Sequence, residues 1–98
     1  ICPQGDAWRD QIRAVGRYTV SGFFCTGTLV NNTNGDRRPL FLTARHCVTS
    51  QADANTVVVF WRYESPTCRA VGSATNGQTL PLNHTATNSG SQLLMSFN

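Results

Sequence analysis

One histidine and the cysteine beside it are the residues of this 98-residue chain whose placement favours chemistry. His46 and Cys47 follow the apolar run Leu40-Phe41-Leu42 after a turn through Thr43-Ala44. A general-base histidine needs an imidazole that is open on one side and rigidly backed on the other. A disulfide at Cys47 would supply that backing, and Cys25 is a natural partner. His46 is therefore the candidate catalytic residue, although an isolated histidine here would be read as a polar loop residue.

The four cysteines limit both the chemistry and the compartment. They are Cys2, Cys25, Cys47 and Cys68, and no two form a C-x-x-C pair. This spacing indicates two disulfides rather than a zinc site, and the residues alone leave three pairings open. A metal site built from His46, His84 and thiols would forfeit a disulfide, so we predict no metal and no other cofactor. Disulfides imply an oxidising compartment, and we expect a secreted or periplasmic protein. The sequence shows no signal peptide, as expected of a processed or trimmed chain.

Length and charge narrow the class of protein further. Ninety-eight residues predict a single domain spanning 1–98. The net charge of +3 comes from eight arginines and no lysine, and only Arg37-Arg38 are adjacent. A nucleic-acid surface would need clustered cations with interleaved aromatics, so no nucleic-acid partner is predicted. No apolar run approaches membrane-spanning length, so no membrane association is predicted either.

Several short strands must position the histidine. Alternation from Asp10 onward predicts a first strand, which Ser21-Gly22 turns into a hairpin of 13–20 with 23–30. Phe23, Phe24, Leu29 and Val30 are expected to supply core bulk. The remaining predicted strands are 40–44, 56–63, 79–82 and 92–97, with polar loops at 31–38, 48–55 and 71–78. Six short strands separated by turns suggest a small antiparallel barrel or sandwich, which makes the chain all-β.

A family resemblance becomes clear at these residues. Thr43-Ala44-Arg45-His46-Cys47, preceded by Cys25-Thr26-Gly27-Thr28-Leu29-Val30-Asn31-Asn32, resembles the histidine-loop signature of the trypsin-like serine proteases. The segments Cys2-Pro3-Gln4-Gly5-Asp6, 9–16 and 58–70 are similar to the secreted bacterial lysyl endopeptidases. The resemblance covers residues 1 to about 75 well. Its motifs are specific, because several separated blocks agree in order and spacing.

The resemblance implies a fold, a pairing and a role. The fold would be the six-stranded antiparallel Greek-key barrel that forms the first, N-terminal half of a trypsin-like protease. The disulfides would be Cys2–Cys68 and Cys25–Cys47, and His46 would be the histidine that takes the proton of a serine nucleophile. The serine of such enzymes lies in a Gly-x-Ser-Gly segment of the second barrel, which this sequence does not contain. The resemblance places the triad carboxylate at Gly90, so the catalytic triad is incomplete in this chain.

Other residues are weaker candidates for the missing roles. Asp53 and Asp36 lie in the loops after and before His46, and each is more simply a solvated loop acid. Asn88 could bond an imidazole but would not stabilise its charged form. Ser89 and Ser91 would lack an oxyanion hole, and a single lost oxyanion donor costs roughly 10²–10³ in rate.

Two functional hypotheses of different class follow. One is a lysyl-endopeptidase-like protease half that acts on peptides or proteins only with a second barrel. The other is a non-catalytic binding or inhibitory module, and a minimal single-barrel hydrolase using its own serine is a third, weaker alternative. Either leading hypothesis leaves an apolar inter-barrel face exposed, which predicts a homodimer, a strand-exchanged dimer or a companion chain.

Overall fold

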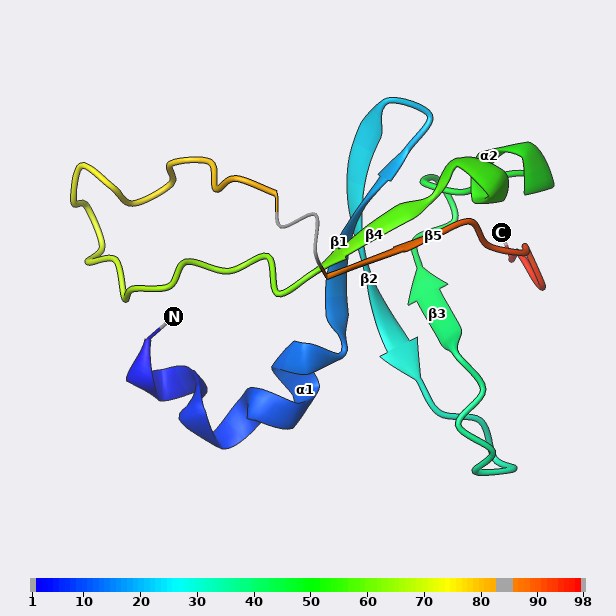
Figure 1. Ribbon diagram of the computed structural model, residues 1–98, viewed down its shortest axis with the longest axis horizontal. Helices are drawn as coiled ribbons and strands as arrows, with labels where there is room; N and C mark the ends of the chain where they lie inside the picture. Colours follow the sequence, from blue (N-terminus) through cyan, green and yellow to red (C-terminus); the bar gives the residue numbers. More distant parts are fainter. Residues whose placement is uncertain (1, 83–85, 98) are drawn as a thin grey trace.

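The computed structural model describes residues 2–82 and 86–97 (Figure 1). The chain begins with the 3-10 helix η1 (Pro3–Trp8) and the short helix α1 (Arg9–Arg13). The strands are β1 (Val15–Val20), β2 (Phe23–Val30), β3 (Leu40–Thr43), β4 (Val58–Trp61) and β5 (Thr87–Ser89). Helix α2 (Gln51–Thr56) lies between β3 and β4. The predicted β-rich class is confirmed, with short helices before the first strand and after the third.

The strands form one antiparallel sheet in the order β3-β2-β1-β4-β5. β1 is the central strand, pairing with β2 from Val15↔Thr28 to Val20↔Phe23 and with β4 from Gly16↔Trp61 to Thr19↔Val58. β3 and β5 are the two ends of this order, so the sheet is open within the described residues. The expected closed barrel of six strands is therefore not what the described sheet shows.

The strands expected at 79–82 and 92–97 are not formed, and β5 was not predicted. The side-chain amide of Gln51 explains part of this difference. Its Nε2 donates to the Ser91 carbonyl oxygen at 3.0 Å, and its Oε1 accepts from the Leu93 N–H at 2.8 Å. These backbone groups are thus satisfied by a side chain of α2 rather than by a neighbouring strand.

Two short helices lie where the sequence predicted the start of a strand and a loop. The first strand was expected to begin near Asp10, but residues 9–13 are helical, with ion pairs Arg9–Asp6 and Arg13–Asp10 that suit helical i,i+3 spacing. The loop expected at 48–55 contains α2. Its N-cap is Ser50, whose hydroxyl oxygen accepts from the Asp53 N–H at 3.1 Å.

The buried cluster that centres on Tyr18 lies on one face of the sheet, and Phe60, which pairs with Arg17, is buried on the other face. The buried cluster is Tyr18, Val20, Val57 and Val59, with Phe41, Trp61, Val48 and the Cys25 and Cys47 side chains packed against it. The prediction that Phe23, Phe24, Leu29 and Val30 supply core bulk is wrong, because all four are exposed, Phe23 to 73%. Phe23 and Leu29 share the Tyr18 face but lie near the ends of β2, outside the buried cluster, whereas Phe24 and Val30 lie on the opposite face.

Both disulfides implied by the resemblance are present. Cys25–Cys47 joins β2 to the turn after β3, and Cys2–Cys68 joins the N-terminal helix to the irregular segment 62–82. Figure 1 shows this segment as a long excursion beside the N-terminal helices, on the side of the sheet away from α2. The second disulfide therefore ties together two parts of the chain that lie outside the sheet.

Candidate functional site

His46 lies in a turn that is anchored on both sides. The turn spans residues 45–47 directly after β3, and the Cys47 N–H donates to the Ala44 carbonyl oxygen at 3.0 Å. Cys47 is bonded to Cys25 on β2, and the next residue, Val48, packs against the core. The backbone that carries His46 is thus tied to the sheet immediately after the imidazole.

Strand β3, which precedes the turn, is fixed by aromatic packing. The Phe41 ring meets Tyr18 edge to face, with centroids 5.6 Å apart, and Trp61 likewise, with centroids 5.9 Å apart. Gly27 of β2 lies opposite Thr43, and a Cβ at Gly27 would meet the Phe41 ring. The missing side chain at Gly27 is what lets the Phe41 ring lie close against β2. Packing at Phe41 therefore sets the position of the strand that leads to His46.

The imidazole itself is open to solvent. His46 is exposed, and no residue in the described ranges forms a hydrogen bond or ion pair with it. An open imidazole on a rigid backbone is the arrangement that a general base requires before its substrate arrives. Its role in catalysis stays a prediction.

Asp53 is engaged in holding the loop after His46. One carboxylate oxygen accepts from the Ser21 hydroxyl at 3.1 Å, and the other accepts from the Thr49 N–H at 3.1 Å and the Thr49 hydroxyl at 2.8 Å. Hydrogen bonds from Thr49 and then Ser21 hold the pKa of Asp53 below its ordinary value. Asp53 thus links the β1–β2 turn to the start of α2.

The other candidate groups are also engaged away from the imidazole. Asp36 accepts from the Arg38 N–H at 3.0 Å and the Asn32 amide at 2.8 Å, and these bonds lower its pKa. Asn88 Oδ1 accepts from the Trp61 indole N–H at 2.7 Å. The Ser91 hydroxyl donates to the Ala54 carbonyl oxygen at 2.7 Å. Each of these polar groups therefore has a structural partner.

Gly90 and Ser89 lie where the resemblance places the triad carboxylate. Gly90 has φ +78°, and its N–H donates to the Val57 carbonyl oxygen at 2.8 Å. A Cβ at Gly90 would meet no atom within 4 Å, so the space is open, but the positive φ would strain any side chain placed there. Ser89 is exposed on β5, opposite Val58. His84 lies outside the described residues.

Within the described residues, no group of three or more histidine, cysteine, aspartate or glutamate side chains is arranged to hold a metal ion. No helix in the same part of the chain has the length and apolar character needed to span a bilayer. Sequence reasoning missed the structural role of Asp53. The signal for it was the Ser50-x-x-Asp53 spacing, which is typical of a helix N-terminus.

The antiparallel sheet leads through its third strand into a disulfide-anchored histidine turn, and comparisons of the sequence place the chain among the trypsin-like, lysyl-endopeptidase-related proteases. Residues 1–97 match the family described as lysyl endopeptidase, C-terminal domain, and the chain belongs to that family. The lysyl endopeptidase of Pseudomonas aeruginosa is 43% identical over 54 residues. That alignment covers 55% of this chain and 12% of the relative, so the chain spans a small part of that protein.

Proposed function

We propose that these residues form the histidine-bearing part of an extracytoplasmic, lysyl-endopeptidase-like serine protease, with His46 as its general base. The observation that carries the proposal is the His46 turn: an exposed imidazole, followed at once by the Cys25–Cys47 disulfide and preceded by a strand fixed through Phe41. The two disulfides support export to an oxidising compartment, secreted or periplasmic.

The reaction would be acyl transfer from a peptide or protein substrate. The Nε2 atom of the histidine would take the proton of a serine hydroxyl as that oxygen attacks the carbonyl carbon, and would return it to the leaving amine. The reaction also needs a carboxylate at Nδ1 and donors for the oxyanion. Gly90 occupies the position that the resemblance assigns to the carboxylate, and Asp53, Asn88 and Ser91 have other partners.

We therefore propose that these 98 residues do not hydrolyse peptide bonds unaided. The nucleophile and the specificity pocket would come from polypeptide outside them, in the same chain or in a companion. Residues 92–97 would then close the sheet into the six-stranded barrel by pairing between the two ends of the strand order, β3 and β5. Leu94, Met95 and Phe97 are each more than half exposed, which leaves them free to pack against such a partner.

The first experiment treats the purified 98-residue chain with a serine-directed fluorophosphonate, a lysyl ester and a fatty ester. We expect no labelling and no turnover. Covalent labelling of a serine would overturn the proposal in favour of a minimal hydrolase. Light scattering over a concentration series tests self-association: we expect a dimer, and a strict monomer at high concentration would count against a partner on the exposed apolar face.

The second experiment supplies the missing parts. Residues 1–97 replace the homologous segment of the Pseudomonas relative, either as they stand or with Gly90→Asp, and each chimera is assayed on a lysyl ester. We expect Gly90→Asp to raise kcat by roughly 10⁴, the scale of a triad-acid loss. We expect His46→Ala in the Gly90→Asp chimera to abolish that gain. A gain that survives His46→Ala would show that His46 is not the base.

A non-catalytic binding module is the second candidate function, and Gly90 is the observation that favours it. A family member that no longer needs its triad carboxylate can carry glycine there, and the φ of +78° at Gly90 suits glycine better than most residues. Under this hypothesis both chimeras stay inactive on the lysyl ester although they fold.

A further inference from the structure

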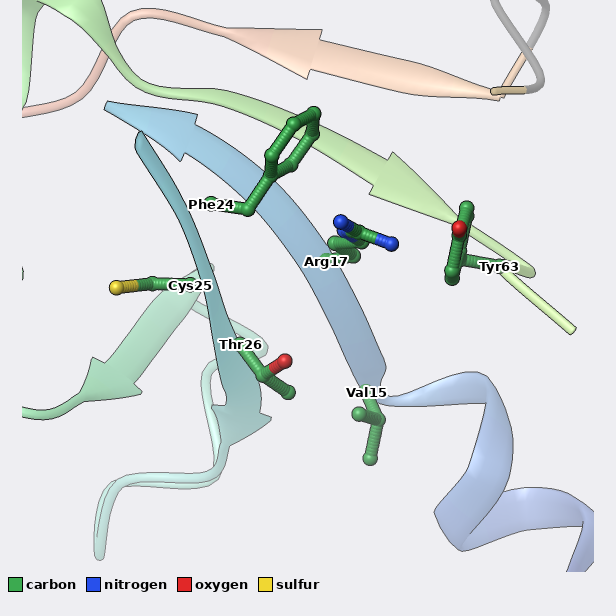
Figure 2. A pocket seen from close by; sticks show the side chains of 6 residues that line it. All are labelled: Val15, Arg17, Phe24, Cys25, Thr26 and Tyr63. Atoms are coloured by element: carbon green, nitrogen blue, oxygen red, sulfur yellow. The ribbon is translucent and has the colours of Figure 1, made fainter. Parts of the chain in front are cut away.

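The sheet face opposite the Tyr18 core carries an arginine that is held between two aromatic rings. Arg17 Cζ lies 4.1 Å from the centroid of the Phe24 ring and 4.4 Å from that of Tyr63 (Figure 2). The antiparallel register explains the first contact, since Thr19 pairs with Phe24 and Arg17 with Thr26, so these side chains share one face.

The second ring is fixed by the backbone of the long excursion. The Tyr63 hydroxyl donates to the Leu80 carbonyl oxygen at 3.2 Å, and the Leu80 N–H lies 3.3 Å from the same hydroxyl oxygen. Tyr63 thus stays beside Arg17 instead of turning into solvent. The two rings already restrict the rotamers of the Arg17 side chain. The entropy cost of ordering this side chain when a ligand binds is therefore smaller.

Stacking leaves the hydrogen-bond donors of Arg17 unused. A guanidinium has five N–H donors at its edge. The ring faces contact the flat side of the group, so they do not occupy these donors in the way that a carboxylate would. The ion pairs among residues 2–82 and 86–97 are Arg9–Asp6 and Arg13–Asp10, and no hydrogen bond is made there by the Arg17 guanidinium or the Thr26 hydroxyl. The charge is therefore positioned but not neutralised.

The donors border a hollow large enough for a ligand group. Its volume is about 360 Å³, and it is lined by Val15, Arg17, Phe24, Cys25, Thr26 and Tyr63. Figure 2 shows the Cys25 side chain pointing away from Arg17. A second hollow of about 320 Å³ shares Val15 and Tyr63 and adds Ile12, Arg62 and Glu64. The two hollows share Val15 and Tyr63, and their lining combines apolar groups with the polar side chains of Arg17, Thr26, Arg62 and Glu64.

We propose that this hollow binds a carboxylate carried on a short apolar peptide group, with Arg17 as the residue that binds the anion. A stacked guanidinium matches the planar geometry and single charge of a carboxylate, with the Thr26 hydroxyl as an additional donor. A phosphate dianion would meet a single stacked cation at Arg17, because the adjoining hollow carries one charge of each sign, Arg62 and Glu64, and so adds no net positive charge. Val15 and Phe24 suit the apolar part of the ligand.

The carboxylate could come from a peptide C-terminus or from an acidic side chain. The site is independent of the proposed protease role, because it lies on the face of β1 and β2 opposite the Cys25–Cys47 disulfide. The test of the carboxylate site therefore uses no catalytic readout. A failure of this proposal would leave the proposed protease role undecided, and the reverse also holds.

The test titrates the isotope-labelled 98-residue chain with three peptides and follows the Arg17 side-chain N–H and the Val15 and Thr26 amides by NMR. The probes are acetylated Gly-Phe-Ala with a free C-terminus, acetylated and amidated Gly-Phe-Glu-Ala, and the same amide with Gln in place of Glu. Saturable shifts with either acid but not with the glutamine peptide support the proposal, and the acid that shifts them identifies the source. Equal shifts with all three, no shifts with any, or tighter binding of inorganic phosphate would overturn it.

Variants separate the guanidinium from general charge. We expect Arg17→Gln to weaken binding about tenfold or more, because a charged hydrogen bond is lost. Arg38→Gln removes the same charge from an exposed loop and should change the affinity by no more than about twofold, because a distant exposed charge is screened. If Arg17→Gln does not fold, the shape-conserving Thr26→Val change at an exposed site should still lower the affinity about threefold. Unchanged affinity in the folded variant would contradict the assignment.

Discussion

The hydroxyl groups of Tyr18 and Thr43 lie 2.7 Å apart, and Thr43 Oγ1 lies 3.0 Å from the Thr26 carbonyl oxygen. A carbonyl oxygen can only accept, so the Thr43 proton goes to Thr26 and the Tyr18 proton goes to Thr43. This directed chain joins β1, β3 and β2 at the end of β3, three residues before His46. The position of the histidine turn thus depends on a buried tyrosine hydroxyl.

Replacing Tyr18 with phenylalanine tests this dependence. The variant keeps the ring against Phe41 but loses the hydrogen bond to Thr43, so we expect the free energy of unfolding to fall by about 1 kcal/mol. Urea unfolding of the two proteins measures the difference. An unchanged free energy would show that the hydroxyl contributes nothing to the fold.

The same tyrosine predicts how stability depends on alkaline pH. Burial raises the pKa of Tyr18 above its ordinary value of 10.0. The unfolded chain therefore ionises first, so the contribution to stability is full below pH 10.0 and is lost as the pH rises through the folded pKa. We expect the free energy of unfolding to decline above that pH in the native chain, and to decline less steeply in Tyr18→Phe. Parallel curves for the two proteins would contradict this assignment.

Gly27→Ala should destabilise the sheet through a clash. The new Cβ would meet the Phe41 ring and lie 2.9 Å from the Leu42 carbonyl oxygen, so ring or strand must shift. Overpacking of this kind costs about 1–3 kcal/mol. Gly77→Ala is the matched control, because its φ is +82° but its surroundings are open, and only backbone strain is added. Thermal unfolding should rank Gly27→Ala as the more damaging change, and the reverse order would refute the clash.

Removal of the Cys25–Cys47 disulfide should loosen the histidine turn selectively. The bridge closes a separation of 22 residues, worth about 3 kcal/mol in the chain-entropy model. Replacing both cysteines by alanine should also speed hydrogen exchange of the backbone amide at position 47, which bonds to Ala44. The Cys2/Cys68 double alanine variant is the control: it lowers overall stability by about 4 kcal/mol but should leave this amide protected relative to the rest of the sheet.

Asp53→Asn should change the acid side of the stability profile. Hydrogen bonds from Thr49 and Ser21 lower the pKa of Asp53 below 3.8, so its contribution is present above that pH and is lost as the pH falls through the folded pKa. The substitution removes one acceptor oxygen and the negative charge, so we expect lower stability near neutral pH and a flatter acid-induced decline. The free energy of unfolding is measured for both proteins from about pH 2 to about pH 7. Parallel dependences on pH in the native chain and in Asp53→Asn would refute this prediction.

Local patterns predicted the elements that build the candidate site. The hairpin around Ser21-Gly22, the apolar strand before His46 and the β-branched run of β4 all form, although β1 begins only at Val15 and β4 spans 58–61 rather than the predicted 56–63. The resemblance carried by the histidine loop supplied the disulfide pairing, which spacing alone left open. Helix α2 was missed, because the polar residues 50–55 resemble a loop until the Ser50 cap is recognised.

By itself, the sequence determined the β-rich class, the two disulfides and an anchored histidine at a strand end, because each follows from short-range residue patterns or specific spaced motifs. The tertiary structure alone decided which polar groups have partners: Asp53 with Thr49, Asn88 with Trp61, and Gln51 with residues 91 and 93. It also placed Arg17 between Phe24 and Tyr63. Most of these contacts join residues distant in the chain, and hydrogen bonding and stacking depend on distances that only the folded sheet sets.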